Sequence, residues 1–190
     1  GQQKHVLVAV LDWGLGHASR MIPVIDRFIA CDYQVMLGGS GKSGELLKAT
    51  FPLLQFITIP SPEVRYSVKS RWLLPSLILQ LPRFLFSMIH EHRLIKKVVA
   101  LHKVDLVVSD NRYGLFCKSA RCIFITHQIS PVLPSWLCWT EYPLYLILRS
   151  IIVRFNECWI PDYADPLHNL SGRLSHRFRL PRNARYIGVL

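Results

Sequence analysis

The chain has 190 residues, of which 51% are hydrophobic and 18% are charged. This composition excludes intrinsic disorder, and the length suffices to bury a core. The formal net charge of +11 favours partners that carry phosphate or another anion, such as an anionic membrane surface, a phosphorylated substrate or a nucleic acid.

Strands and helices alternate in the first half of the chain. The apolar run at 5–11 is typical of a strand buried on both faces of a parallel sheet. The pattern then predicts a helix over 18–29, a strand over 33–37, a helix over 44–50 and a strand over 54–59. A long helical stretch follows from about 72 to 101, and we expect Pro75 and Pro82 to break it into short pieces.

The alternation continues to the end of the chain. The pattern predicts strands over 105–109, 122–126 and 158–160, a short helix over 113–118, one or two helices over 136–155 and an extended piece at 185–187. Strands joined by helical crossovers form parallel sheets with helices on both faces. The predicted fold class is therefore α/β, a Rossmann-like doubly wound parallel sheet.

Parallel sheets of this kind bind ligands at the carboxyl ends of their strands. The loop after the first predicted strand carries Gly14 and Gly16, which allow close approach of a ligand to the backbone. His17 stands where the next helix begins, and a histidine there can titrate near neutral pH. The alternative is that His17 caps the helix or packs against Trp13.

The second loop resembles a nucleotide-binding P-loop, with a Gly-Lys-Ser triplet ending at Ser43. That motif needs a glycine separated from the triplet by four residues, and Met36 occupies the position. We therefore expect a glycine-rich turn before a helix, with no binding of nucleotide triphosphate.

Polar side chains also follow two later strands. Asp110 could orient and charge-balance a histidine, as a carboxylate supports the imidazole of a catalytic pair. Its alternative is a helix N-cap. The candidate substrate-binding residues after these strands are Asn111, Arg112, Thr126, His127 and Gln128. Side chains of these types hydrogen-bond sugar hydroxyls, although structural capping would also explain the loop after the fifth strand.

Together these motifs resemble the acceptor domain of GT-B glycosyltransferases, including the bacterial UDP-sugar transferases and, more distantly, the lipid-linked GlcNAc transferase of peptidoglycan synthesis. The resemblance runs through almost the whole chain. It implies an acceptor-binding domain over 1–170 and a basic segment over 171–190 that leads to an interdomain linker. It also implies a donor-binding domain that is absent from this chain, which alone is expected to be inactive.

The resemblance further implies that a sugar moves from a nucleotide-diphosphate donor to an acceptor hydroxyl, on a sugar or on a lipid-linked or envelope acceptor. The implied catalytic base is His17, and its implied partner is Asp110. Arg20 joins the substrate-binding set, and Gly14 and Gly16 leave room for the diphosphate. We expect no cofactor and no metal, since the sequence shows no carboxylate cluster. The five scattered cysteines include no Cys-x-x-Cys pair.

The stretch from 71 to 97 mixes apolar and basic side chains, as interfacial helices do. The predicted membrane contacts are Trp72, Arg83, Phe84, Lys96 and Lys97. The alternative is that these side chains pack onto the sheet or meet another domain. We expect a cytoplasmic protein, attached peripherally to the inner face of the membrane if this prediction holds.

Two other functions fit the sequence. One is a peripheral membrane or anionic-polymer binding module, and the other is a nucleotide-sugar epimerase built on the same fold. Nucleic-acid binding has the charge but lacks a recognisable module, so we expect no nucleic-acid partner.

Overall fold

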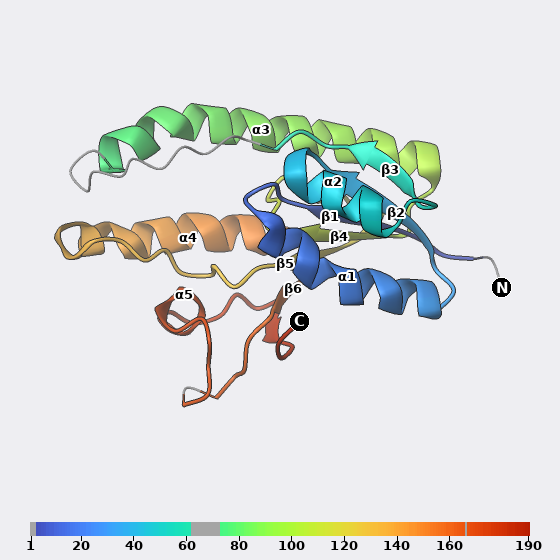
Figure 1. The fold of residues 1–190 in the computed structure, drawn as a ribbon. Helices are drawn as coiled ribbons and strands as arrows, with labels where there is room; N and C mark the ends of the chain where they lie inside the picture. Colours follow the sequence, from blue (N-terminus) through green and yellow to red (C-terminus); the bar gives the residue numbers. More distant parts are fainter. Residues whose placement is uncertain (1–2, 62–72, 166) are drawn as a thin grey trace.

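A seven-stranded parallel sheet, in the order β3-β2-β1-β4-β5-β6-β7, runs through the computed structural model, which describes residues 3–61, 73–165 and 167–190 (Figure 1). The strands are β1 His5–Val10, β2 Gln34–Gly39, β3 Gln55–Thr58, β4 Leu106–Asp110, β5 Arg121–Ile125, β6 Glu157–Ile160 and β7 Ala184–Tyr186. Every neighbouring pair is parallel, which confirms the predicted fold class.

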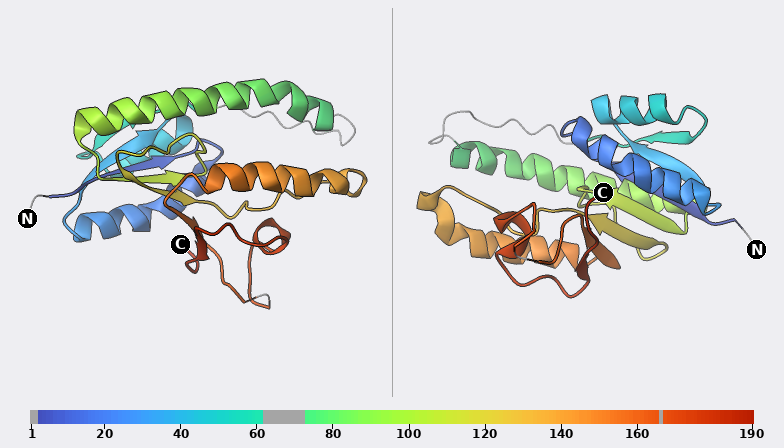
Figure 2. Two further views of the ribbon diagram at one scale, coloured as in Figure 1. Left: turned by 180° about the vertical axis from the view of Figure 1, so that it is seen from behind. Right: turned by 60° about the horizontal axis from the view of Figure 1, so that its bottom comes forward.

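Helices cover both faces of the sheet (Figures 1 and 2). They are α1 Leu15–Ala30, α2 Gly41–Thr50, α3 Leu73–His102, the 3-10 helix η2 Ser135–Thr140, α4 Glu141–Ile152 and α5 Arg173–His176. Side chains of α1 and α2 pack on one face, in a core that includes Met21 and Leu47. Side chains of α3 and α4 pack on the other, in a core that includes Ile95 and Tyr145. Successive strand residues point to opposite faces, so every central strand is buried on both sides.

Helices α3 and α4 both extend past the carboxyl ends of the strands (Figure 1). The expected break of α3 is wrong, because one helix runs from Leu73 to His102 with Pro82 inside it. Pro75 lies in the first turn, where backbone amides have no helical partner to lose. Pro82 removes one hydrogen bond, which the packing of the later turns on the sheet offsets.

The predicted helix over 113–118 is also wrong, because these residues form turns. The amide of Gly114 donates to Glu91 Oε2 at 3.0 Å, and a side chain at position 114 would collide with the carbonyl of Met88. The backbone is thus held against α3 and cannot coil into a helix of its own.

The predicted domain boundary at residue 170 falls inside the unit that carries the sheet. Strand β7 pairs with β6, and the amide of Ser130 donates to the carbonyl of Leu174 at 2.7 Å. Residues 171–190 therefore complete the sheet edge, and a linker role for them stays a prediction.

Candidate active site

His17 and Asp110 meet at the carboxyl edge of the two central strands. Val10 at the end of β1 is in register with Asp110 at the end of β4, and α1 begins a few residues beyond Val10. His17 Nδ1 lies 2.7 Å from Asp110 Oδ2. The Asp110 side chain is fully buried and that of His17 is 14% exposed, so the pair has one open side. The expected contact is present, while the chemical roles of the two residues stay predictions.

Arg20 lies one turn further along α1 and joins the same cluster. Its Nη2 forms an ion pair with Asp110 Oδ1 and lies 3.0 Å from His17 Nδ1. Its Nη1 lies 3.2 Å from Nδ1 of His127, which follows β5. The guanidinium was expected to bind substrate, but it is occupied by these side chains and is 16% exposed. It neutralises the buried charge of Asp110, which would be costly unpaired.

His127 and Gln128 are half-buried beside this cluster. Burial lowers the pKa of His127 from its ordinary value of 6.5, and the charges of Arg20 and His17 lower it further. The imidazole of His127 is therefore kept neutral at physiological pH.

Two predicted substrate ligands, Asn111 and Thr126, are buried instead. Asn111 adopts a positive φ of 55°, which asparagine tolerates, and its amide donates to the carbonyl of Ile125 at 3.0 Å. The hydroxyl of Thr126 accepts the amide of Gln128 at 3.0 Å. Both residues shape the loops, and neither presents its side chain to solvent.

Arg112 is a third correction, because its side chain is completely buried. Its Nη1 donates to the carbonyl of Val10 at 3.0 Å and to the hydroxyl of Ser61 at 2.9 Å. Its Nη2 pairs with Glu91 Oε1 at 2.8 Å. Burial raises the pKa of Glu91 despite the opposing charge of Arg112. Arg112 thus ties α3 to the ends of the strands and is not available to a substrate.

Gly14 and Gly16 leave open space at the start of α1. A Cβ at either position would meet nothing within 4 Å, and Gly14 has a φ of 113° that favours glycine. The carbonyl of Gly14 accepts the hydroxyl of Ser43 at 3.1 Å, which ties the loop to α2. The backbone beside His17 is thus accessible, as the sequence predicted for both glycines.

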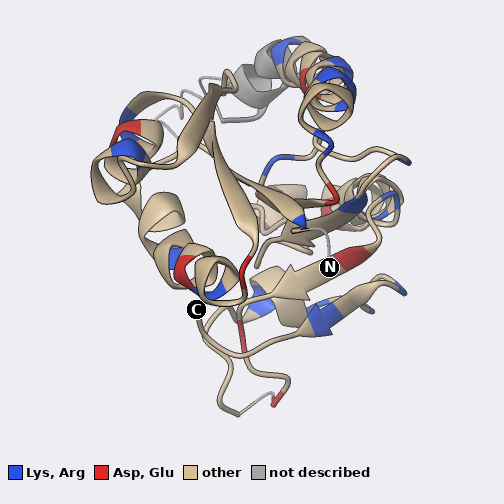
Figure 3. Cartoon of the chain, turned by 90° about the vertical axis from the view of Figure 1, so that its right-hand side faces the viewer, with Lys and Arg blue, Asp and Glu red and all other residues tan. Residues whose placement is uncertain are grey.

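Within the described residues, the predicted membrane contacts differ in exposure. Arg83, Lys96 and Lys97 are exposed on α3, where Lys and Arg outnumber Asp and Glu (Figure 3). Phe84 is half-buried and packs edge-on against Tyr113, with 5.9 Å between ring centroids. Phe84 therefore belongs to the core, and Trp72 lies outside the described residues.

A second carboxylate–histidine pair, not predicted from the sequence, lies at the end of β6. His176 Nε2 lies 3.2 Å from Asp162 Oδ2, and His176 Nδ1 lies 3.2 Å from the hydroxyl of Tyr186. Burial would raise the pKa of Asp162, but hydrogen bonds from Ser171 and the amide of Leu170 lower it below its ordinary range. Since both ring nitrogens of His176 have partners, this cluster holds the loop between β6 and β7.

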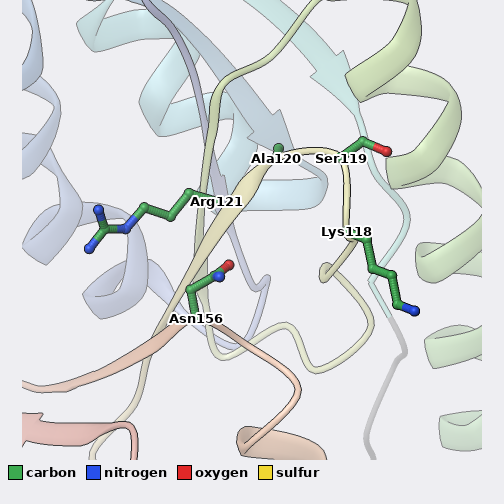
Figure 4. Close-up of a pocket in the computed structure, with 5 residues that line it drawn as sticks. All are labelled: Lys118, Ser119, Ala120, Arg121 and Asn156. Atoms are coloured by element: carbon green, nitrogen blue, oxygen red, sulfur yellow. The ribbon is translucent and has the colours of Figure 1, made fainter.

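A shallow pocket of about 580 Å³ lies at the opposite, amino edge of the sheet. It is lined by Lys118, Ser119, Ala120, Arg121 and Asn156 (Figure 4). The side chains of Lys118 and Arg121 point in different directions, and Arg121 forms an ion pair with Glu157. Within the described residues, no group of three or more His, Cys, Asp or Glu side chains could hold a metal ion. The candidate site is therefore the His17 cluster at the carboxyl edge, and not this pocket.

Comparison with known proteins gives a fold and no family. No protein-family model matches the chain, and no curated protein matches it. Among solved structures, UGT2 of Phytolacca americana, complexed with UDP-2fluoro-glucose and pterostilbene, is 11% identical, with a TM-score of 0.58 over 98% of this chain and 53% of that one. A glycosyltransferase from Rickettsia africae ESF-5 is 13% identical, with a TM-score of 0.55 over 99% of this chain and 43% of that one.

A third structure, from Listeria monocytogenes and assigned as a UDP-N-acetylglucosamine 2-epimerase, is 9% identical, with a TM-score of 0.54 over 96% of this chain and 44% of that one. The fold is therefore GT-B glycosyltransferase-like. The chain spans about half the length of these three structures.

Proposed function

We propose that this chain is the acceptor-binding portion of a glycosyltransferase, of the hexosyltransferase type. It would transfer a sugar from a nucleotide-diphosphate donor, such as a UDP-sugar, to a hydroxyl group of an acceptor. The observation that carries the proposal is the contact of 2.7 Å between His17 and Asp110 at the carboxyl edge of the central strands. The similar folds of two glycosyltransferases support it.

The geometry suits His17 as a general base. Its Nδ1 faces Asp110, so Nε2 is left to take the proton of the acceptor hydroxyl as the hydroxyl oxygen attacks the anomeric carbon of the donor. The bond from that carbon to the diphosphate breaks, and the diphosphate leaves with the electron pair. Asp110 orients the imidazole and stabilises its positive charge.

The donor pocket would belong to a second domain, and the open backbone at Gly14 and Gly16 would leave room for the diphosphate. This chain alone would then be inactive. We expect no resident cofactor and no required metal, because helix N-termini can offset diphosphate charge.

The test is an assay of the full-length protein against a panel of nucleotide sugars, with hydrolysis and transfer both measured. His17→Ala should lower the rate by at least ~10²-fold, the scale of general-base catalysis. A matched control is His168→Ala, because His168 also pairs with an aspartate, Asp165, but is 75% exposed. Full activity of His17→Ala would contradict the proposal.

A nucleotide-sugar epimerase is the second candidate, favoured by the similarity to the Listeria monocytogenes structure. The same assay distinguishes the two reactions. An epimerase converts the nucleotide sugar to its epimer with no acceptor added, whereas a transferase releases the nucleotide only as the sugar moves to an acceptor or to water.

We also propose that the acceptor is held at a membrane surface, with η2 and α4 as the contact. Trp136, Trp139 and Tyr142 are 50%, 74% and 56% exposed on the helices that extend past the carboxyl edge (Figure 1). Trp and Tyr favour the membrane–water interface, and each nearby basic residue adds ~1 kcal/mol of attraction to anionic lipid. None of the helices, over the residues described, is long and apolar enough to span a bilayer.

Liposome co-sedimentation tests this surface. The protein should bind anionic vesicles at low salt, lose that binding as salt is raised, and ignore neutral vesicles. Replacing Trp136 and Trp139 by Ser should abolish the binding, whereas Leu53→Ser, at a still more exposed apolar site before β3, should not. If wild type ignores anionic vesicles at low salt, the acceptor is soluble and the surface has another role.

A further inference from the structure

One guanidinium lies between two imidazoles at the candidate site. Arg20 Nη2 lies 3.0 Å from His17 Nδ1, and Arg20 Nη1 lies 3.2 Å from His127 Nδ1. We propose, on the basis of the proposed transferase function, that Asp110 and Arg20 hold these two histidines in opposite tautomers, Asp110 acting on His17 and Arg20 on His127. His17 then offers an unprotonated Nε2 as a base, and His127 offers an Nε2–H as a hydrogen-bond donor to the same substrate.

The tautomer of His17 follows from its partner. Asp110 is paired with Arg20 and so is ionised, and an ionised carboxylate can only accept hydrogen bonds. The contact of 2.7 Å between Asp110 Oδ2 and His17 Nδ1 is therefore a hydrogen bond only if Nδ1 carries the proton. Arg20 Nη2 then donates to Asp110 as well, so its 3.0 Å contact with His17 Nδ1 is between two donors that share one carboxylate and is not a hydrogen bond. The lone pair of the neutral His17 ring is on Nε2.

The tautomer of His127 follows from the opposite constraint. A guanidinium can only donate hydrogen bonds, so His127 Nδ1, 3.2 Å from Arg20 Nη1, has to accept. A neutral imidazole that accepts at Nδ1 carries its proton on Nε2. Burial, Arg20 and His17 disfavour a second proton on this ring, and the carboxylates of Asp110 and Asp162 oppose them without prevailing.

This arrangement selects a class of acceptor. Both rings contact one guanidinium through Nδ1, and we infer that the Nε2 atoms of the two rings serve two neighbouring oxygen atoms of one acceptor. One oxygen is the hydroxyl that loses its proton to His17, and the other accepts the hydrogen bond from His127. A vicinal diol, as on a sugar ring, has this pair of oxygens, and an isolated alcohol does not.

Arg20 is therefore a positioning residue, since it acts through Asp110 and His127. Because Asp110 occupies its Nη2 and His127 its Nη1, the guanidinium has little left to offer a substrate. Its removal should change the protonation of His127 directly and leave the reacting atoms of the substrate without an ordered donor.

Nuclear magnetic resonance tests the tautomers without an assay of activity. Two-bond ¹H–¹⁵N spectra of the labelled chain at pH 7.5 should show the proton on Nδ1 of His17 and on Nε2 of His127, assigned with His17→Gln and His127→Gln. In Arg20→Met the pKa of His127 should rise and its single tautomer should give way to a mixture, whereas the exposed His168 should not change. The same tautomer on both rings in wild type would overturn the proposal, even if Arg20→Met did not fold.

The activity of the full-length enzyme tests whether His127 donates a hydrogen bond to the substrate. Glutamine places an amide N–H near the position of the histidine Nε2–H, and leucine does not. We expect His127→Gln to stay within ~10-fold of wild type and His127→Leu to lose ~10²-fold, the scale for a lost transition-state donor. At His17, where a base is needed, both substitutions should be equally damaging. Equal loss for His127→Gln and His127→Leu would overturn the donor role. An absence of any transferase activity would contradict the proposed function. The tautomers of His17 and His127 would still be tested by the ¹H–¹⁵N spectra.

Discussion

Helices α1 and α2 both begin after glycine-containing loops at the carboxyl ends of neighbouring strands, but only the start of α2 is filled by a side chain. Asp12 Oδ1 accepts the amide of Ser43 at 3.1 Å, and Gly41 has a φ of 54° that brings its backbone against the same carboxylate. The positive end of the α2 dipole is thus occupied by a charge of the protein itself. This explains why the loop with the more familiar nucleotide-binding appearance is a structural turn.

The start of α1 differs at each of these points. Within the described residues no side chain caps it, and its first turn contains no acidic residue. Gly14 and Gly16 are exposed, with open space where a side chain would be. His17 lies in this first turn and faces Asp110. A helix start without an internal anion, beside a histidine whose side chain is 14% exposed, is the better place for a negatively charged or hydroxyl-bearing ligand.

The largest effect that separates the two helix starts should come from glycine-to-alanine substitutions. A Cβ at position 41 would collide with Asp12 Oδ2 and would also force alanine to adopt a positive φ. Gly41→Ala should therefore lower the free energy of unfolding by about 2–3 kcal/mol, the sum of backbone strain and a lost cap. Gly16→Ala should change it by less than about 1 kcal/mol, since alanine favours the helix and has room. Urea denaturation measures both, and equal losses would contradict the comparison.

A smaller loss should follow removal of the cap itself. Asp12→Ala frees the amide of Ser43 and should lower the free energy of unfolding by about 1 kcal/mol, as for other N-cap losses. Asp12→Asn keeps an acceptor oxygen and should lose less. If Asp12→Ala is as stable as wild type in urea, the carboxylate does not stabilise α2.

The sequence predicted the sheet and the central pair for one physical reason. Strands buried on both faces have continuous apolar runs, and the carboxyl ends of parallel strands meet at one edge. That placed His17 and Asp110 together, although 93 residues separate them. It also placed Arg112 and Thr126 at this edge, but a strand's end does not say whether a polar side chain points into solvent or into the protein.

What the sequence missed depends on partners from distant elements. Glu91, which buries Arg112, comes from α3, and nothing near either residue in the sequence indicates the pair. The role of Asp12 depends on the position of α2 relative to β1. The exposure of Trp136 and Trp139 depends on α4 extending past the sheet, whereas the sequence pattern predicted only one or two helices over 136–155. Contacts of this kind require the packed structure.

The pH dependence of stability should report on His127, which lies beside the start of α1. Because the pKa of His127 is lowered in the folded chain, the unfolded chain binds a proton near pH 6.5 that the folded chain does not. Stability should therefore fall as the pH drops through 6.5, and His127→Gln should lose less stability than wild type over that range. His168→Gln is the control and should follow wild type. A wild-type curve with no steeper fall than that of His127→Gln would mean that the folded and unfolded chains protonate His127 alike.

The last prediction is that ATP has no effect on the melting temperature through the start of α2. ATP at millimolar concentration should not raise the melting temperature of the chain, because Asp12 already occupies the amide of Ser43 at the start of α2 and would repel a triphosphate. The basic surface could bind ATP weakly at many sites, so the measurement needs moderate salt, which screens exposed charges. Asp12→Ala is the informative variant, since it removes the internal anion and leaves the glycine-rich turn. A small rise confined to Asp12→Ala would show that the carboxylate excludes phosphate there. A clear rise in wild type that survives salt would contradict the assignment of residues 38–43 as a structural turn.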